Sequence, residues 1–255
     1  RWDLFNLGKE PITIGLWVGG DSLPNKTEDL IIEYNKLKIN QPNKVPFSCC
    51  PWCGSNIEGE DKMDNENLDN RENQWFANKV HLICSNNKCS FSYPKRRARA
   101  RLNDQGPLPV CLSDEIIYQH PPTLLFGTVD KFAQLAHKVN GTDSGRNADS
   151  RRLFGRGNWE QGKPKNGYLP PDLIIQDELH LLLGPLGSAV ALFESAIDQL
   201  CTREDGTRPK IISSTATTRN TQFQIAALFD RGVNLFPKPG VECDDSFFAF
   251  YKRRF

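Results

Sequence analysis

The sequence predicts an α/β protein built on a doubly wound, mostly parallel β-sheet. Segments with strand character alternate with segments whose apolar residues recur at helical spacing, which is typical of parallel βαβ units. Two of the apolar segments, residues 173–176 and 210–213, each end in a distinctive polar sequence. A stretch rich in Cys, Asn and Asp interrupts the alternation at residues 46–95. We therefore expect an α/β domain, residues 1–45 and 96–255, that carries a small inserted module.

The first expected strands and helices flank this insertion. Residues 11–18 are mainly apolar and stop at Gly19-Gly20, which predicts a buried strand. Residues 28–37 have helical periodicity and predict a short helix. Beyond the insertion, residues 123–128 predict the next strand and residues 129–139 the helix after it. The apolar positions of the first helix are Leu30, Ile31, Tyr34 and Leu37.

The remaining elements follow a long loop at residues 140–171, rich in Gly, Asn and Arg. Loops of this length usually carry function or are partly disordered. The runs at 173–176 and 210–213 predict two strands, and residues 188–200 and 220–229 predict the helix after each. One face of the helix at 188–200 is expected to carry Val190, Phe193, Ile197 and Leu200.

Composition narrows the class of protein. With 38% hydrophobic and 25% charged residues, the chain falls in the ordinary soluble globular range. Lys+Arg 32 and Asp+Glu 31 nearly cancel, so any basic surface for nucleic acid must be local. No apolar run is long enough for a transmembrane helix, and we expect no membrane partner. The chain begins without Met or a signal-peptide pattern, so we expect a fragment of a longer protein.

Cysteine spacing in the insertion predicts a structural zinc site. The 8 cysteines are unevenly clustered, which favours metal binding in a reducing compartment over disulfides. Cys50-x2-Cys53 and Cys84-x4-Cys89 supply four thiolates, the ligand set of tetrahedral Zn²⁺. A segment this polar has few other means of folding. The cysteines expected to be buried in the core or incidental are Cys111, Cys201 and Cys243.

Other residues around the insertion leave alternatives open. Cys49 competes with Cys50, and His81 is a substitute ligand. The aromatic residues are expected to form the module's core, with stacking on unpaired bases as the alternative. The basic run at residues 95–101 is either a phosphate-binding segment or a solvated surface. The aromatic set is Trp75, Phe76, Phe91 and Tyr93, and the arginines of the run are Arg96, Arg97, Arg99 and Arg101.

Polar residues follow three expected strands, at the ends where parallel sheets bind ligands. P-loop ATPases present a magnesium-binding carboxylate beside a water-orienting one at the end of an apolar strand. The chemistry requires carboxylates because a hard cation prefers oxygen ligands and the attacking water needs a base. The alternative is that these side chains cap the following helices and that the glycine serves a tight turn. The three groups are Gly127-Thr128, Asp177-Glu178 and Ser214-Thr215-Ala216-Thr217.

The sequences at 177–180 and 214–217 resemble the DExH box and the Ser/Thr-Ala-Thr motif of superfamily 2 helicases. The resemblance implies a RecA-like parallel sheet with helices on both faces, forming part of the first motor domain. It implies that Asp177 holds the magnesium of bound ATP and that Glu178 orients or deprotonates the attacking water. His180 would face the coupling hydroxyls, which are those of Ser214, Thr215 and Thr217. Gly127, Thr128 and Lys131 resemble the helicase element that contacts nucleic-acid phosphates.

Longer strings resemble the family of helicase subunits (DrmA-like proteins) of the DISARM phage-defence system of bacteria. The resemblance implies an ATP-driven translocase on DNA that works with a partner subunit of the same system in the bacterial cytoplasm. The implied cofactors are ATP and Mg²⁺ for the parent protein, beside the structural Zn²⁺. The strings are residues 14–19, 50–54, 122–133, 171–180, 184–187, 214–217, 236–240 and 245–249.

The 255 residues lack two sequence features that an ATPase motor requires. They contain no G-x-x-x-x-G-K-[ST] phosphate loop and no second motor domain with an arginine finger. We therefore expect hydrolysis by the parent protein and none by this chain alone. The competing hypothesis is a non-catalytic module that binds nucleic acid or protein through a degenerate ATPase fold and the zinc insertion. A two-metal nuclease would need more clustered acids than these strand ends supply.

Overall fold

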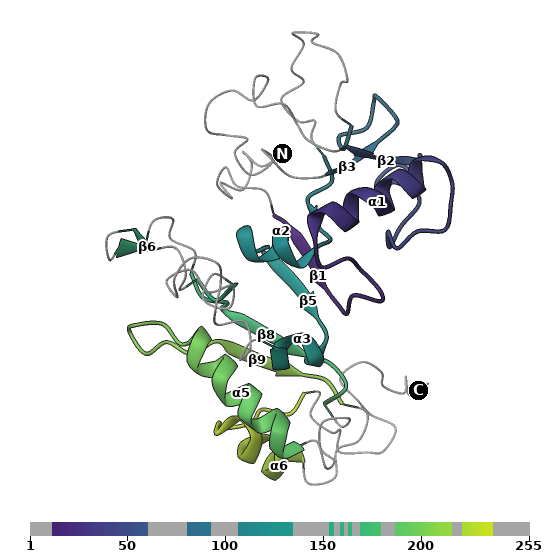
Figure 1. The fold of residues 1–255 in the computed structure, drawn as a ribbon. Coiled ribbons are helices and arrows are strands. Elements are labelled where there is room, and N and C mark those ends of the chain that lie inside the picture. Colours follow the sequence, from purple (N-terminus) through teal and green to yellow (C-terminus); the bar gives the residue numbers. More distant parts are fainter. Residues whose placement is uncertain are drawn as a thin grey trace, which may run out of the picture. The chain divides into compact units, whose positions relative to one another are not determined.

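The computed structural model describes much of the chain (Figure 1). The described residues are 12–60, 81–92, 107–134, 153–155, 159–160, 163–164, 169–179, 187–215 and 221–236. They belong to two compact units, residues 1–169 and residues 170–255. Both units combine parallel strands with helices, so the α/β class expected from the sequence is confirmed.

The first unit is organised around a three-stranded parallel sheet in the order β4-β1-β5. The strands are β4 (Val110–Cys111), β1 (Ile14–Trp17) and β5 (Leu124–Gly127). Two threonines lock β1 and β5 in register just before the strands begin. The N–H of Thr13 donates to Thr123 Oγ1 at 3.2 Å, and the N–H of Thr123 donates to Thr13 Oγ1 at 3.0 Å.

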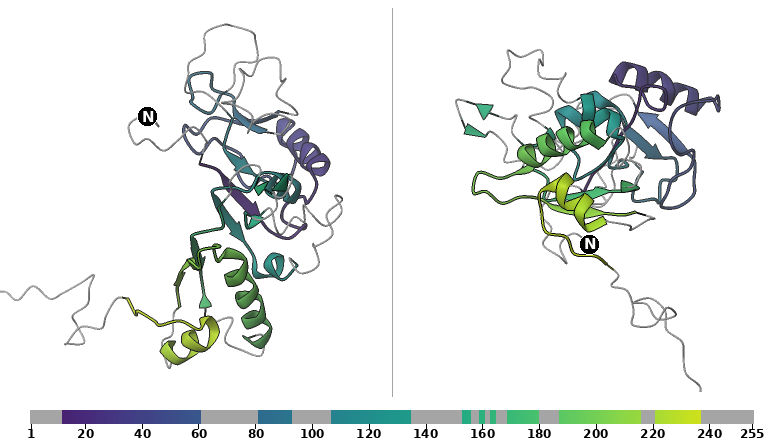
Figure 2. Two further views of the ribbon diagram at one scale, coloured as in Figure 1. Left: turned by 90° about the vertical axis from the view of Figure 1, so that its left-hand side faces the viewer. Right: turned by 90° about the horizontal axis from the view of Figure 1, so that it is seen from below.

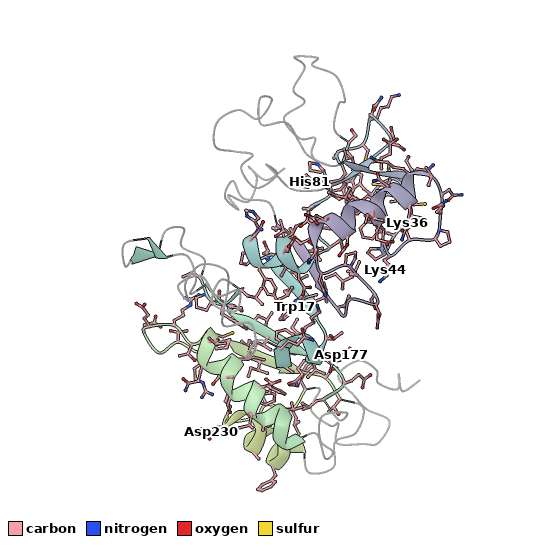
Figure 3. The ribbon with its side chains drawn as sticks, viewed as in Figure 1. Trp17, Lys36, Lys44, His81, Asp177 and Asp230 are labelled. Atoms are coloured by element: carbon pink, nitrogen blue, oxygen red, sulfur yellow. The ribbon has the colours of Figure 1, made fainter. Side chains whose placement is uncertain are left out.

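The described part of this unit includes the helices α1 (Thr27–Lys38), α2 (Asp114–Gln119) and α3 (Val129–Ala133), of which α2 contacts both β1 and α1. The core of the unit centres on Trp17, which is fully buried (Figure 3). Its ring makes edge-on contacts with Tyr118 of α2, at a centroid distance of 5.9 Å, and with Phe132 of α3, at 5.1 Å. Aromatic pairs favour this edge-to-face geometry, which also anchors both helices.

The cysteine-rich insertion contains an antiparallel pair, β2 (Ile57–Glu60) and β3 (His81–Cys84). Strand β2 contacts α1, as the neighbouring ribbons in Figures 1 and 2 also show. A backbone hydrogen bond of 2.9 Å from Leu108 to Leu82 ties the insertion to the segment leading into β4. A short antiparallel pair, β6 (Trp159–Glu160) with β7 (Lys163–Pro164), lies within the long loop expected at 140–171.

The second unit is built on two parallel strands, β8 (Leu173–Gln176) and β9 (Lys210–Ser213). Each is followed by a helix, α5 (Gly187–Cys201) or α6 (Thr221–Phe229), and the two helices contact each other. Near the start of the strands, Asp198 accepts hydrogen bonds from the guanidinium groups of Arg208 and Arg231. These ion pairs join α5 to the segment before β9, which contains Arg208, and to the segment after α6, which contains Arg231.

Most expected elements are confirmed, with differences in burial and extent. Strand β1 was expected to be buried, but Ile14 is 40% exposed because one face of the strand is open in this unit. The helix expected at 129–139 is described as far as Ala133, and residues 135–139 lie outside the described part. Strand β4 and helix α2 were not expected from the sequence. Cys111 and Cys201 are buried as expected, and Cys243 lies outside the described residues.

Candidate functional site

Four cysteine side chains of the insertion converge on one point. The Sγ atoms of Cys50, Cys53, Cys84 and Cys89 all lie within 4.8 Å of one another. The Cys50–Cys89 separation is 3.8 Å and the Cys53–Cys84 separation is 3.4 Å. A tetrahedron with Zn–S bonds of ~2.3 Å has S–S edges of ~3.8 Å. The four thiols could therefore hold a metal ion such as Zn²⁺ with little adjustment.

Two tight turns bring the thiols together. In the first, the N–H of Gly54 donates to the Cys50 carbonyl at 2.9 Å, and Gly54 adopts a φ of 74°, which favours glycine. In the second, backbone N–H groups point at the sulfurs: Asn86 N–H lies 3.4 Å from Cys84 Sγ, and Phe91 N–H lies 3.4 Å from Cys89 Sγ. Such N–H groups stabilise thiolates and orient them as ligands.

The ionisation of the thiols also fits a metal site. Burial raises the pKa of the Cys84 thiol to about 12 and raises the pKa of Cys89. Hydrogen bonds from Ser55 lower the pKa of the exposed Cys53 thiol to about 6. Without a cation, the two buried thiols therefore stay protonated near neutral pH. A bound divalent metal supplies the positive charge that allows four thiolates to lie this close together.

The structure separates the four clustered cysteines from the two alternative ligands, Cys49 and His81. Cys49 is exposed, and its sulfur lies 3.8 Å from the Ser48 hydroxyl rather than in the cluster. His81 is buried in β3. In the backbone register of the β2–β3 pair it lies opposite Glu60, at the other end of the strand from Cys84. Phe91 makes an edge-on contact with the ring of Trp52, which is 70% exposed. The other expected core aromatics, Trp75, Phe76 and Tyr93, lie outside the described residues.

The second candidate site lies at the carboxyl end of the β8–β9 pair (Figure 3). The strands are in register, with Gln176 opposite Ser213, so the residues that follow them meet directly. The Ser214 hydroxyl donates a hydrogen bond to Asp177 Oδ1, and the N–H of Glu178 donates to the same oxygen at 3.0 Å. Both bonds that Asp177 accepts from described residues therefore end on one carboxylate oxygen.

The backbone at this site has a strained conformation that a hydrogen bond to β9 holds in place. Glu178 has a φ of 52°, in the left-handed region, which costs a non-glycine residue on the order of 1–2 kcal/mol. The next residue, Leu179, is fully buried, and its N–H donates to the Ser214 carbonyl at 2.9 Å. Anchoring Leu179 across to β9 holds the chain in this turn. Asp177 and Glu178 consequently stay exposed side by side at the strand ends.

A further side chain supports β8 immediately before this pair. Gln176 Nε2 donates to Glu194 Oε1 on α5 at 3.1 Å. Burial raises the pKa of Glu194, and the hydrogen bond from Gln176 partly opposes that shift. Glu194 also lines a polar cavity of about 460 Å³, together with α5 residues such as Asp198 and with the end of α6. Sequence periodicity assigned no role to either Gln176 or Glu194.

The described residues that were expected to contact nucleic acid differ in their exposure to solvent. Gly127 and Thr128 lie exposed at the end of β5. Lys131 is 3% exposed, and its ammonium donates to Asp114 Oδ2 at 2.7 Å and to Asn25 Oδ1 at 3.0 Å. This ammonium serves the interior of the fold, so a direct contact with phosphate would require it to leave both partners.

Several expected site residues fall outside the described part of the chain. They are His180, Thr217 and the basic run containing Arg96, Arg97, Arg99 and Arg101. Of the coupling residues, Ser214 and Thr215 are described. The roles assigned to all these residues stay predictions. Within the described ranges, no helix is both long and apolar enough to cross a membrane.

Comparison with known proteins identifies a bacterial relative. The chain is 31% identical over 268 aligned residues to DISARM protein DrmA from Bacillus paralicheniformis. The alignment covers 95% of this chain and 22% of that protein, so the chain corresponds to a limited part of its relative. This similarity supports a DrmA-like relationship. No protein-family model matches the sequence.

Proposed function

We propose that the chain forms part of the first motor domain of an ATP-dependent DNA translocase that acts in antiphage defence. The observation that carries the proposal is the junction of the two strand ends in the second unit. There the Ser214 hydroxyl meets Asp177 Oδ1, and Glu178 is held beside it in a strained turn. The printed name of the relative, DISARM protein DrmA, supports the assignment to defence.

Asp177 is the proposed ligand of a nucleotide-bound Mg²⁺ ion. Because the described hydrogen bonds both fall on Oδ1, they leave Oδ2 to a cation. Mg²⁺ is typically bound by one or two protein carboxylates, substrate phosphates and several waters. An exposed carboxylate whose rotamer is fixed by Ser214 meets that requirement. When bound, the ion would neutralise developing charge on the transferred phosphoryl group.

Glu178 is the proposed base, or orienting group, for the attacking water. It is exposed and adjacent to Asp177, and its backbone is held in the left-handed region. Strained residues of this kind cluster at functional sites, where the surrounding structure maintains them. Ser214 links this pair to β9 and so is one of the proposed coupling residues, with Thr215 and Thr217.

In the first unit, the proposed DNA contact lies at the carboxyl ends of β1 and β5. Exposed Gly127 and Thr128 form the junction of β5 with α3. A Cβ on Gly127 would lie 2.9 Å from the ring of Phe132, so only glycine permits this close packing of strand and helix. We propose a RecA-like fold class for the α/β part, with the zinc insertion in a structural role.

The proposal is tested by ATP hydrolysis of the whole parent protein with Mg²⁺, measured with and without DNA. Hydrolysis that requires Mg²⁺ and rises with DNA is the expected result. DNA binding without hydrolysis would instead favour the non-catalytic binding module. A hydrolysis rate that DNA does not change would contradict the translocase assignment.

A further inference from the structure

We propose that Lys131 is a positioning residue, whose buried ammonium fixes the loop after β1 against the DNA-contacting end of β5. This inference rests on the proposed DNA contact at Gly127 and Thr128 and goes beyond it. Lys131 then acts on DNA through Asn25 and the surrounding backbone, without touching phosphate itself.

The Lys131–Asp114 ion pair is buried on both sides. The side chains are 4% and 7% exposed, and their charged atoms lie 2.7 Å apart. Removing one member of such a pair leaves the other charge buried and uncompensated, which is strongly unfavourable. Transfer of the ammonium to a DNA phosphate would have this effect on Asp114. The geometry therefore favours a permanent internal role for Lys131 over a surface contact.

Asn25 extends the ion pair to the loop that follows β1. Its side-chain oxygen accepts from Lys131 at 3.0 Å, and its backbone carbonyl accepts from the N–H of Glu115 at 3.2 Å. The Glu115 carboxylate in turn accepts from the N–H of Thr27 at 2.8 Å, where α1 begins. Helix α2 therefore holds this loop through the backbone of Glu115, and helix α3 holds it through the side chain of Lys131. The ion-pair partner of Lys131, Asp114, directly precedes Glu115 in α2.

The loop held by Asn25 lies at the same sheet edge as the proposed DNA contact. Trp17 is in register with Gly127, and the N–H of Thr128 donates to the Trp17 carbonyl at 3.2 Å. The residues beyond both strand ends, Gly19-Gly20 and Thr128, are exposed. The Asn25 amide nitrogen also packs close to Gly20, 3.3 Å from where a Cβ would stand. Lys131 therefore sets the relation between two exposed strand-end loops.

The test uses the full-length parent protein and its Asn25→Ala variant. Asn25 is exposed, so its loss should leave the fold and the Lys131–Asp114 pair intact. We expect about tenfold weaker DNA binding, the size of one charge-assisted hydrogen bond. The DNA concentration for half-maximal ATPase stimulation should rise equally, while the maximal rate and the DNA-free rate stay unchanged. Asn35→Ala, an exposed asparagine on α1, is the matched control and should behave as the unmutated protein.

A second variant, Asp114→Asn, separates positioning from direct contact by the sign of its effect. If Lys131 met phosphate, removal of the nearby negative charge would leave DNA binding unchanged or strengthen it. Positioning predicts weaker binding, because the ammonium loses the partner that holds it. The unfolding midpoint, measured alongside, confirms that each variant compared is folded.

The outcomes distinguish this inference from the function on which it rests. Weaker DNA binding by both folded variants would support positioning. Unchanged binding by Asn25→Ala, or unchanged or stronger binding by folded Asp114→Asn, would overturn it while leaving the proposed function intact. Absence of DNA binding by the unmutated protein would overturn the proposed function and this inference together.

Discussion

Replacement of one buried cysteine of the cluster, Cys84→Ser, tests the candidate zinc site most sharply. The four sulfur atoms lie within 4.8 Å of one another, close to the geometry of a Zn²⁺ tetrahedron. Structural zinc sites in small peptides bind with ~10–16 kcal/mol at neutral pH. If four thiolates share that free energy equally, the loss of one forfeits roughly 3 kcal/mol. Zinc affinity should therefore fall about a hundredfold or more.

The assay compares zinc content and zinc release in matched serine variants. Elemental analysis should find about one zinc per chain in the unmutated protein, and a chelator titration should give the affinity. Cys84→Ser should release zinc at a chelator concentration about a hundredfold lower. Cys49→Ser removes an exposed thiol outside the cluster and should behave as the unmutated protein. Equal zinc retention by Cys84→Ser, or equal zinc loss in Cys49→Ser, would refute the assignment.

Three further predictions concern the α/β units. Gly127→Ala should lower the free energy of unfolding by about 1–3 kcal/mol, because the new Cβ clashes with an aromatic ring. Gly19→Ala has nothing within 4 Å and should cost less than about 0.5 kcal/mol in the same urea titration. Ser214→Ala should slow ATP hydrolysis by the parent about tenfold, since Asp177 loses a charge-assisted hydrogen bond; an unchanged rate would remove Ser214 from the site. Burial raises the pKa of Glu194 above its usual 4.5, so the folded state binds its proton more tightly and stability falls as pH rises from 4.5 to the raised value. Glu194→Gln should flatten that fall in pH-dependent urea unfolding, and an unchanged profile would contradict the assignment of this fall to Glu194.

The elements around the strand-end site could be predicted from the sequence because their signals are local. Strands β8 and β9 are short segments, Leu-Ile-Ile-Gln and Lys-Ile-Ile-Ser, in which consecutive apolar residues are followed by polar ones, and their bounds agree with those expected. Helix α5 shows the expected apolar face, with Val190 and Ile197 buried. In contrast, β4 has two residues, too few for any periodicity. Helix α2 has six residues, and its main signal is the Ser113 cap at its start.

The candidate metal site could also be predicted in part from the sequence. The spacing of the cysteines indicated four ligands, but it could not separate Cys50 from its neighbour Cys49. The turn closed by Gly54 settles that choice, because it directs Cys50 toward the cluster and leaves Cys49 exposed. No local pattern distinguishes two adjacent cysteines before such a turn is known.

Long-range partners set the remaining differences. Lys131 was expected to contact nucleic-acid phosphate because, with Gly127 and Thr128, it resembles a helicase element that does so. Its carboxylate partner, Asp114, lies 17 residues earlier, and its amide partner, Asn25, lies 106 residues earlier. Sequence periodicity carries no information on either pairing. The same holds for Gln176 and Glu194, which meet only because α5 runs alongside β8 (Figure 1).

The most direct test of the proposed function is DNA-stimulated ATP hydrolysis by the parent protein and its Glu178→Gln variant. Glu204→Gln, an exposed glutamate in the loop before β9, is the matched control. We predict that Glu178→Gln lowers the rate by about a hundredfold or more while ATP and DNA binding persist, since general-base groups contribute ~10²–10⁴-fold. Glu204→Gln should retain full activity. Equal activity in Glu178→Gln and the unmutated protein would contradict the catalytic role of this strand end.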